Sequence, residues 1–129
     1  MTRQFILPAG APQPVSYYSH GIRVGAMLYS AGQTARDATG QLDGPGDVRQ
    51  QAERAFYNLS LVLDEAEMGF QEVVRLNIFV RNIRDLPEIF EVKERYFKEH
   101  RPALTVAAVT SLAYAEYLLE VEAIAVQNI

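Results

Sequence analysis

Hydrophobic residues recur between positions 48 and 66 with the three- and four-residue spacing that places them on one side of an α-helix. Asp47 precedes this stretch, and its side chain can accept hydrogen bonds from the free amides of a first helical turn. Gly69 can take the left-handed conformation that often ends a helix. The pattern predicts one long amphipathic helix, whose buried stripe consists of Val48, Ala52, Ala55, Phe56, Leu59, Val62, Leu63 and Ala66.

Shorter apolar stretches have the alternation of a β-strand. In residues 74–80, Val74, Leu76, Ile78 and Val80 alternate with more polar positions, which predicts a half-buried strand. Gly25 marks a turn between two further apolar stretches, and several prolines indicate an irregular lead-in. The remaining strands are expected at residues 15–24, 26–31, 103–109 and 117–126, with irregular segments at 1–14 and 32–46.

A second helix is expected to begin at Asp85, with Pro87 in its first turn, where a missing amide hydrogen costs nothing. Its apolar side contains Ile89, Phe90, Tyr96 and Phe97. The predicted order ββαβαββ indicates a single α+β domain over residues 1–129, with both helices on one face of a mixed sheet. With only two helices, the second face of this apolar sheet is expected to meet another subunit.

The last predicted strand carries two carboxylates on one face. Glu120 and Glu122 are two positions apart, so their side chains point the same way from an otherwise apolar strand. A buried, unpaired carboxylate is costly, and a neighbouring like charge adds to that cost. This face therefore opens to water or to a pocket, or one carboxylate has a chemical task; a solvated edge explains the pattern equally well.

Composition excludes several classes of function. The net charge of −4 and the scattered basic residues argue against a nucleic-acid-binding surface. Cysteine is absent, and the two histidines, His20 and His100, are far apart, so neither a metal site nor a cysteine nucleophile is expected. We find no secretory signal and no apolar stretch of membrane-spanning length. These features predict a cytoplasmic protein that does not act at a membrane.

Four short motifs resemble those of the Rid/YjgF family. They are Tyr18-Ser19 before a strand, Ala31-Gly32-Gln33 after the next, Arg101-Pro102-Ala103-Leu104-Thr105-Val106, and Glu120-Val121-Glu122-Ala123-Ile124-Ala125. The resemblance implies a chorismate-mutase-like fold and a homotrimer with a barrel-like core, which binds a small-molecule ligand in clefts between subunits. It also implies hydrolysis of reactive enamines and imines to ketoacids and ammonia, without a cofactor.

The resemblance assigns roles to individual residues. Glu120 stands at the place of the family's water-binding glutamate, and Tyr18 at that of its cleft tyrosine. Three expected cleft residues differ from the family pattern: Ala31, beside Gly32, replaces a serine, Phe90 replaces an asparagine, and Leu104 replaces the arginine that clamps the substrate carboxylate. Arg101 is a candidate replacement for this clamp, although a surface or subunit contact is the favoured interpretation of it.

Further alternatives remain open from the sequence. Tyr18 could pack at an interface instead of contacting a ligand, and His20 is best interpreted as structural or as a surface residue. Tyr114, Tyr117 and Leu104 predict a cleft less polar than in the deaminases. Because Leu104 offers no hydrogen-bond donor, we retain three hypotheses: a deaminase that hydrolyses imines or related carbonyl compounds, a non-catalytic ligand-binding trimer, and a chaperone-like trimer.

Overall fold

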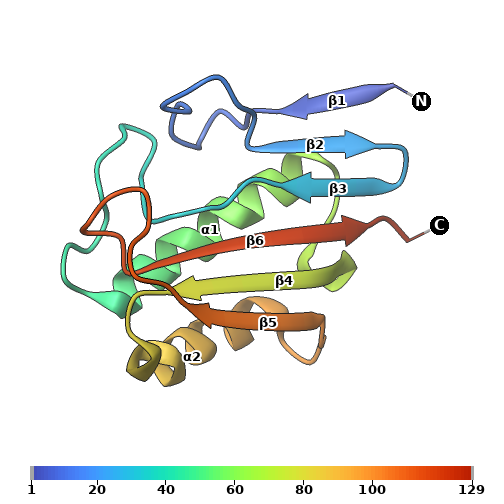
Figure 1. Ribbon diagram of the computed structural model, residues 1–129. Coiled ribbons are helices and arrows are strands. Elements are labelled where there is room, and N and C mark those ends of the chain that lie inside the picture. Colours follow the sequence, from blue (N-terminus) through green and yellow to red (C-terminus); the bar gives the residue numbers. More distant parts are fainter. Residues whose placement is uncertain (1, 129) are drawn as a thin grey trace.

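A computed structural model describes residues 2–128 and contains one six-stranded sheet with strand order β1-β2-β3-β6-β4-β5. Neighbouring strands are antiparallel except for the parallel pair β4 and β5, so the sheet is mixed, as predicted. Both long helices lie on the same side of it (Figure 1). The strands are β1 Arg3–Ile6, β2 Gly21–Val24, β3 Met27–Ser30, β4 Val73–Val80, β5 Ala103–Ala108 and β6 Leu119–Val126, and the helices are α1 Val48–Glu65 and α2 Leu86–Phe97, with 3₁₀ turns η1 Phe70–Glu72 and η2 Ile83–Asp85.

The core lies between the sheet and the two helices. Burial alternates along β6 as the sequence predicted, and Leu119 and Val121 are completely buried on its helix-facing side. Phe56 and Leu59 of α1 pack in the same cluster. Because strand side chains alternate, this packing directs Glu120 to the opposite, helix-free face. The core pattern therefore determines which side of the sheet carries the carboxylates.

The N-terminal region differs from the prediction. Residues 3–6, expected to be irregular, form edge strand β1, because the prolines interrupt the chain only after Ile6, which is completely buried. The strand expected at 15–24 begins only at Gly21, and the segment before it is a loop. The amide of His20 donates to the Ile6 carbonyl at 3.0 Å, which closes this loop onto the end of β1.

The ends of both helices are partly as predicted. Asp47 caps α1, since its side chain accepts a hydrogen bond from the Gln50 amide at 3.1 Å. Gly69 does not end α1: the left-handed residue is Glu67, with φ of 60°, whereas Gly69 is extended. Asp85 lies in η2, and within residues 2–128 its side chain makes no capping hydrogen bond to α2. The preceding 3₁₀ turn directs the chain into α2 without that cap.

Strand β4 contains an irregularity that the alternation could not reveal. Its register against β6 shifts between Val73 and Arg75, which reverses the alternation at that point. Val73 is therefore buried and Val74 is 47% exposed, although Val74 was predicted to share the buried face. From Leu76 onward the predicted alternation holds, and Leu76, Ile78 and Val80 are buried.

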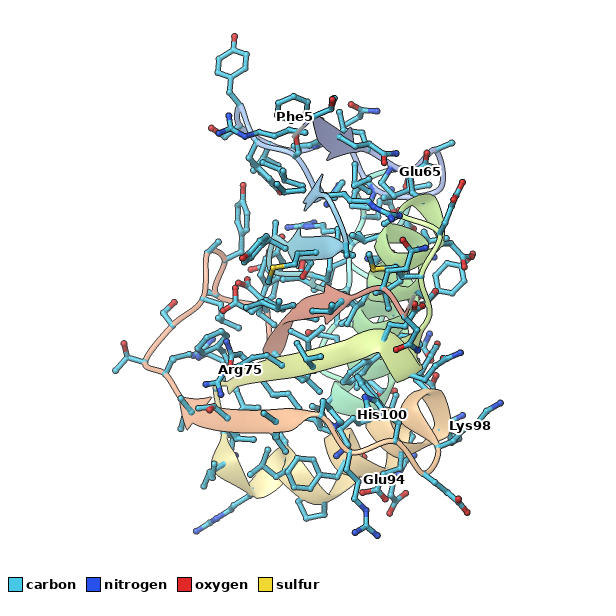
Figure 2. The ribbon with its side chains drawn as sticks, turned by 90° about the vertical axis from the view of Figure 1, so that its right-hand side faces the viewer. Phe5, Glu65, Arg75, Glu94, Lys98 and His100 are labelled. Atoms are coloured by element: carbon cyan, nitrogen blue, oxygen red, sulfur yellow. The ribbon has the colours of Figure 1, made fainter. Side chains whose placement is uncertain are left out.

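The helix-free face of the sheet carries an apolar row. Phe5, Ile22, Tyr29 and Ile124 pair in register across β1, β2, β3 and β6, so their side chains share one face. Phe5 is 63% exposed and Tyr29 47% exposed in the single chain. Figure 2 shows Arg75 on this side of the sheet, away from the helices. The apolar row is what the predicted contact with another subunit would cover.

Candidate functional site

A cavity of about 340 Å³ opens at the end of the sheet where three loops meet. The loops follow β1, β3 and β5, and they gather at the left of Figure 1. Each contributes residues to the wall, and Asn58 of α1 completes it. The lining contains one carboxylate, one guanidinium, three tyrosines and a closely packed glycine: Glu120, Arg36, Tyr18, Tyr114, Tyr117 and Gly32.

Glu120 enters this cavity from the start of β6. Its register partner on β4 is Phe79, so it lies on the helix-free face beside an aromatic residue. Burial, with a smaller contribution from the neighbouring charge of Glu122, raises the pKa of the Glu120 carboxyl above its usual value. Among residues 2–128, no group lowers that pKa by donating a hydrogen bond to the carboxylate. Because Glu120 lines the cavity, its carboxylate can hold water or a ligand there.

Gly32 and Glu120 are brought into direct contact. A Cβ atom built on Gly32 would lie 2.6 Å from Glu120 Cδ and 2.9 Å from Cγ, so a larger residue would displace the carboxylate. The next residue, Gln33, exchanges backbone hydrogen bonds of 2.7 and 3.0 Å with Val121. This bridge fixes the Gly32 backbone against β6. The adjacent Ala31 is tied through its amide to His20 and does not line the cavity.

Tyr18 forms another part of the wall and is 44% exposed. Burial raises the pKa of its phenol, and the charges of Tyr117 and Glu120 raise it further by smaller amounts. The Tyr18 phenol is therefore close enough to the Glu120 carboxylate to interact with its charge. Its ring packs edge-on against the ring of His20, with centroids 5.9 Å apart. The structure thus brings together three residues predicted from the sequence: Tyr18, Gly32 and Glu120.

His20 has the structural role that the sequence favoured. It is 4% exposed, and its Nε2 lies 2.6 Å from the Pro12 carbonyl oxygen. Its Nδ1 lies 3.3 Å from Nε2 of the Gln33 amide. Because the Pro12 carbonyl can only accept and the Gln33 NH₂ can only donate, this pattern fits neutral histidine with its proton on Nε2. The histidine holds the lead-in loop against the loop that carries Gly32.

Arg36 is a cavity residue that sequence reasoning missed. Its guanidinium carbon lies 5.1 Å from the ring centroid of Tyr114 and 5.0 Å from that of Tyr117. Its Nε–H donates to the Tyr117 hydroxyl at 2.7 Å, and Nη1 donates to the Gly40 carbonyl at 3.0 Å. The sequence predicted from Tyr114 and Tyr117 a cleft less polar than in the deaminases, and the structure adds a cation between these two rings. From the sequence, Arg36 belongs only to the irregular segment 32–46. No helical or strand spacing connects it with residues 114–117, so its contact with Tyr114 and Tyr117 could not be predicted.

Arg101 and Leu104 line a separate hollow beside the end of α2. Figure 2 shows Glu94, Lys98 and His100 of this hollow close together. Leu104 is 38% exposed, and its register partner on β4 is Leu76, which faces the helices. Glu120 points to the opposite face, so one chain does not bring Leu104 to the cavity.

Phe90 is also remote from the cavity, because it packs against the core from α2. The ammonium of Lys93 lies 5.1 Å from the centroid of its ring. A joint site that contains Phe90, Arg101, Leu104 and Glu120 would require two chains, and it stays a prediction.

This mixed sheet with two helices on one face defines an α+β protein of the YjgF, chorismate-mutase-like class. Residues 9–127 match the family model described as Endoribonuclease L-PSP, so the chain belongs to that family, which includes the Rid/YjgF proteins indicated by its motifs. No helix within residues 2–128 is long and apolar enough to cross a membrane.

Relatives of known sequence cover almost the whole chain. It is 33% identical over 126 residues to a RutC family protein of Pyrococcus abyssi, covering 97% of this chain and 98% of the relative. It is 34% identical over 129 residues to the 2-iminobutanoate/2-iminopropanoate deaminase of Bos taurus, covering 99% and 93%.

Solved structures give the same family. YyfA, a Rid-family protein of Yersinia pestis, superposes with a TM-score of 0.91 at 28% identity, covering 97% of this chain and 99% of that one. E. coli TdcF with bound serine superposes with a TM-score of 0.89 at 28% identity, over the same shares of the two chains. Family membership and deaminase-named relatives support an activity of the enamine and imine deaminase type.

Proposed function

We propose that this protein hydrolyses small reactive enamines or imines, with Glu120 as the general base. The observation that carries the proposal is the position of Glu120 in the cavity: half-buried, against Gly32, with a raised pKa and oxygens that can hold water. A carboxylate whose pKa is closer to neutrality takes and returns a proton more readily than an ordinary surface glutamate. Relatives named as iminobutanoate and iminopropanoate deaminases support this class of substrate.

The chemistry requires one water and returns the proton that it borrows. A water held by the Glu120 carboxylate attacks the imine carbon, while Glu120 takes one proton and the imine nitrogen gains another from solvent. The resulting carbinolamine collapses as the carbon–nitrogen bond breaks, its hydroxyl becomes the carbonyl, and the nitrogen leaves as ammonia. Glu120 then gives its proton up, so imine and water become ketone and ammonia. We expect the Tyr18 phenol, which lines the same cavity, to donate a hydrogen bond to the substrate.

Ammonia release from 2-aminoacrylate generated in the assay tests this function. We expect turnover by the natural protein and a loss of about 10²–10⁴-fold in Glu120→Gln, the usual contribution of a general base. Glu122→Gln is the matched control at pH values well above the pKa of Glu120, where the base is ionised in both proteins, because it removes a carboxylate from the same face two positions away. Equal ammonia release with and without Glu120, across a set of amino-acid-derived imines, would contradict the proposal.

A non-catalytic ligand-binding protein is the second candidate. The observation that favours it is Leu104, a side chain without hydrogen-bond donors at the position where the family resemblance calls for arginine. Such a protein would be stabilised by small acids in thermal unfolding and would not release ammonia from any imine. The chaperone-like hypothesis has no specific observation in its favour.

We also infer a homotrimer in which the apolar row on the helix-free face is covered by neighbouring subunits. The exposure of Phe5 and Tyr29 supports this, since such rows on a single chain usually mark an interface. In that assembly, Phe90, Arg101 and Leu104 of one subunit would approach the Glu120 cavity of the next. A cytoplasmic location completes the proposal and fits a chain without cysteine.

A further inference from the structure

Arg36 is the one permanent cation among the described residues that line the Glu120 cavity. Glu120 is the one carboxylate among these lining residues, and the others carry no permanent charge. The cavity therefore contains a cation, the Arg36 guanidinium, and an anion, the Glu120 carboxylate at the proposed reacting centre. Such a cation is a natural binding group for the acidic end of a ligand.

The guanidinium is held before any ligand arrives. Tyr117 accepts from Nε at 2.7 Å, Gly40 accepts from Nη1 at 3.0 Å, and two tyrosine rings flank the group. The loop that carries Gly40 is itself braced, because the Asp37 carboxylate accepts from the amides of Thr39 and Gln41 at 2.9 and 3.1 Å. An arginine fixed in this way loses little conformational entropy on binding an anion.

Arg36 also keeps donors for a ligand. A guanidinium has five N–H donors, and the hydrogen bonds to Tyr117 and Gly40 use two of them. The nearest carboxylate within residues 2–128 is that of Glu116, 3.9 Å from Nη2, with a side chain that is 53% exposed. An ion pair so long and so exposed is weak and is readily replaced by a better-placed anion. One N–H of Nη1 and both of Nη2 therefore remain for the carboxylate of a ligand.

The remaining wall is aromatic. Tyr18 and Tyr114 are 44% and 42% exposed, so both present ring surface that a ligand can cover. A volume of about 340 Å³ falls in the range of small-molecule pockets, and it exceeds what a three-carbon acid fills. Flat, unsaturated molecules stack well on such rings.

We propose that Arg36 is the anion-binding residue of this cavity and that the cavity takes flat, unsaturated monocarboxylates, whose bodies lie against Tyr18 and Tyr114. The carboxylate clamp would then stand on the loop after β3 of the same chain that carries Glu120, in place of the donor that Leu104 cannot supply. Because it shares the cavity assigned to imine hydrolysis, this role of Arg36 as a specificity residue rests on the proposed function and narrows its substrate class.

Calorimetric titration with cinnamate and cinnamamide tests the role of Arg36, since the two probes have the same flat body and differ in charge. We expect the natural protein to bind cinnamate at least about tenfold more tightly than cinnamamide, a difference of about 1.4 kcal/mol. In Arg36→Gln the ratio of cinnamate to cinnamamide affinity should fall to about one. Arg36→Lys keeps the charge without the planar guanidinium, so this variant should retain part of the preference for cinnamate.

Arg81→Gln is the matched control. Arg81 also holds the loop before β6, through a hydrogen bond of 2.6 Å from Nη1 to the Ala115 carbonyl, but it does not line the cavity. We expect this variant to keep the full preference for cinnamate. A purely structural Arg36 would weaken both probes equally and leave their ratio unchanged, and that result would overturn the inference. Failure of the natural protein to bind cinnamate, or to prefer it, would overturn it as well.

Failure of this inference can be distinguished from failure of the proposed function. Ammonia release that depends on Glu120, together with a cinnamate preference that survives Arg36→Gln, would refute only the anion-binding role. A preference that depends on Arg36, without ammonia release from any imine, would refute only the hydrolase. The Glu120→Gln variant should still bind cinnamate more tightly than cinnamamide, because Arg36, which binds the carboxylate of the ligand, remains.

Discussion

Gly32 lies directly against the side chain of Glu120, and a Cβ atom at position 32 would come within 2.6 Å of Glu120 Cδ. Gly32→Ala should therefore push the carboxylate out of its position, because the neighbouring Gln33 backbone is fixed to Val121 and cannot retreat. We expect ammonia release to fall by about 10²-fold, the usual cost of a misplacement of about 1 Å. The free energy of unfolding should fall by about 1–3 kcal/mol, as for other overpacked sites.

Gly10→Ala is the control for this substitution. A Cβ atom there would meet Leu61 Cδ1 at 3.4 Å, an ordinary contact, and Gly10 does not line the Glu120 cavity. Activity and denaturant midpoint should both stay near those of the natural protein. If Gly32→Ala were as active as Gly10→Ala, the close approach of residue 32 would not be needed to position Glu120.

Glu122→Gln should shift the pH dependence of turnover. Burial is the larger cause of the raised pKa of Glu120, and the charge of Glu122 adds to it. Removing that charge should lower the pKa of Glu120, so the base is deprotonated at lower pH. The acidic limb of the profile of kcat/KM against pH should therefore move to lower pH. Profiles of the two proteins at constant ionic strength give the shift. An upward shift would mean that Glu122 does not act on Glu120 through its charge.

Glu120→Gln should stabilise the protein at neutral pH even though it removes the base. The folded-state pKa of Glu120 lies above its ordinary value of 4.5, so between 4.5 and the folded-state pKa the folded protein holds a proton that the unfolded chain has lost. Stability contributed by this group is therefore present at acid pH and falls as pH rises through the folded pKa. The difference in Tm between the variant and the natural protein should grow from about pH 4 to about pH 8. A constant difference over this range would contradict the raised pKa.

The sequence predicted the architecture well because core patterns repeat along helices and strands. The stripe of α1 and the alternation in β6 follow the spacing of one element each, so they are visible without tertiary information. The position of Val74 was wrong because a register shift in β4 depends on how β6 pairs with it. Edge strand β1 was missed because its four residues carry too short an alternation to distinguish from a loop.

The candidate site was only partly predictable for a related reason. Glu120 was recognisable because a carboxylate is unexpected in a buried-type strand, and the motifs placed Tyr18 and Gly32 beside it. Arg36 reaches the cavity through a turn and cation–π contacts with Tyr114 and Tyr117, which are distant in sequence, and no local pattern encodes such contacts. Leu104 and Arg101 lie in another hollow of the same chain, so their predicted meeting with Glu120 depends on assembly.

His20 should be essential for the shape of the cavity and not for its chemistry. His20→Leu would remove the donor to the Pro12 carbonyl and one of the two acceptors of the Gln33 amide, whose Nε2 still donates to the Ala31 carbonyl at 3.2 Å. The loss should lower the free energy of unfolding by about 1–3 kcal/mol. Because Glu120 is the proposed base, the pH at which remaining activity is half-maximal should not change. A double-mutant cycle with Gln33→Leu should show that the combined loss is smaller than the sum. Additive losses would show that the two side chains act independently.

Tyr29→Glu should disrupt the proposed trimer. Tyr29 is in the middle of the apolar row on the helix-free face, where a carboxylate in each subunit would be buried against its neighbours. Light scattering should report a trimer for the natural protein and a smaller species for the variant. Tyr57→Glu is the matched control, because Tyr57 is 44% exposed against 47% for Tyr29 but lies on α1, on the other side of the sheet. A trimer that survives Tyr29→Glu, or dissociates equally with Tyr57→Glu, would place the subunit contact elsewhere, and the route by which Leu104 could approach Glu120 would be lost with it.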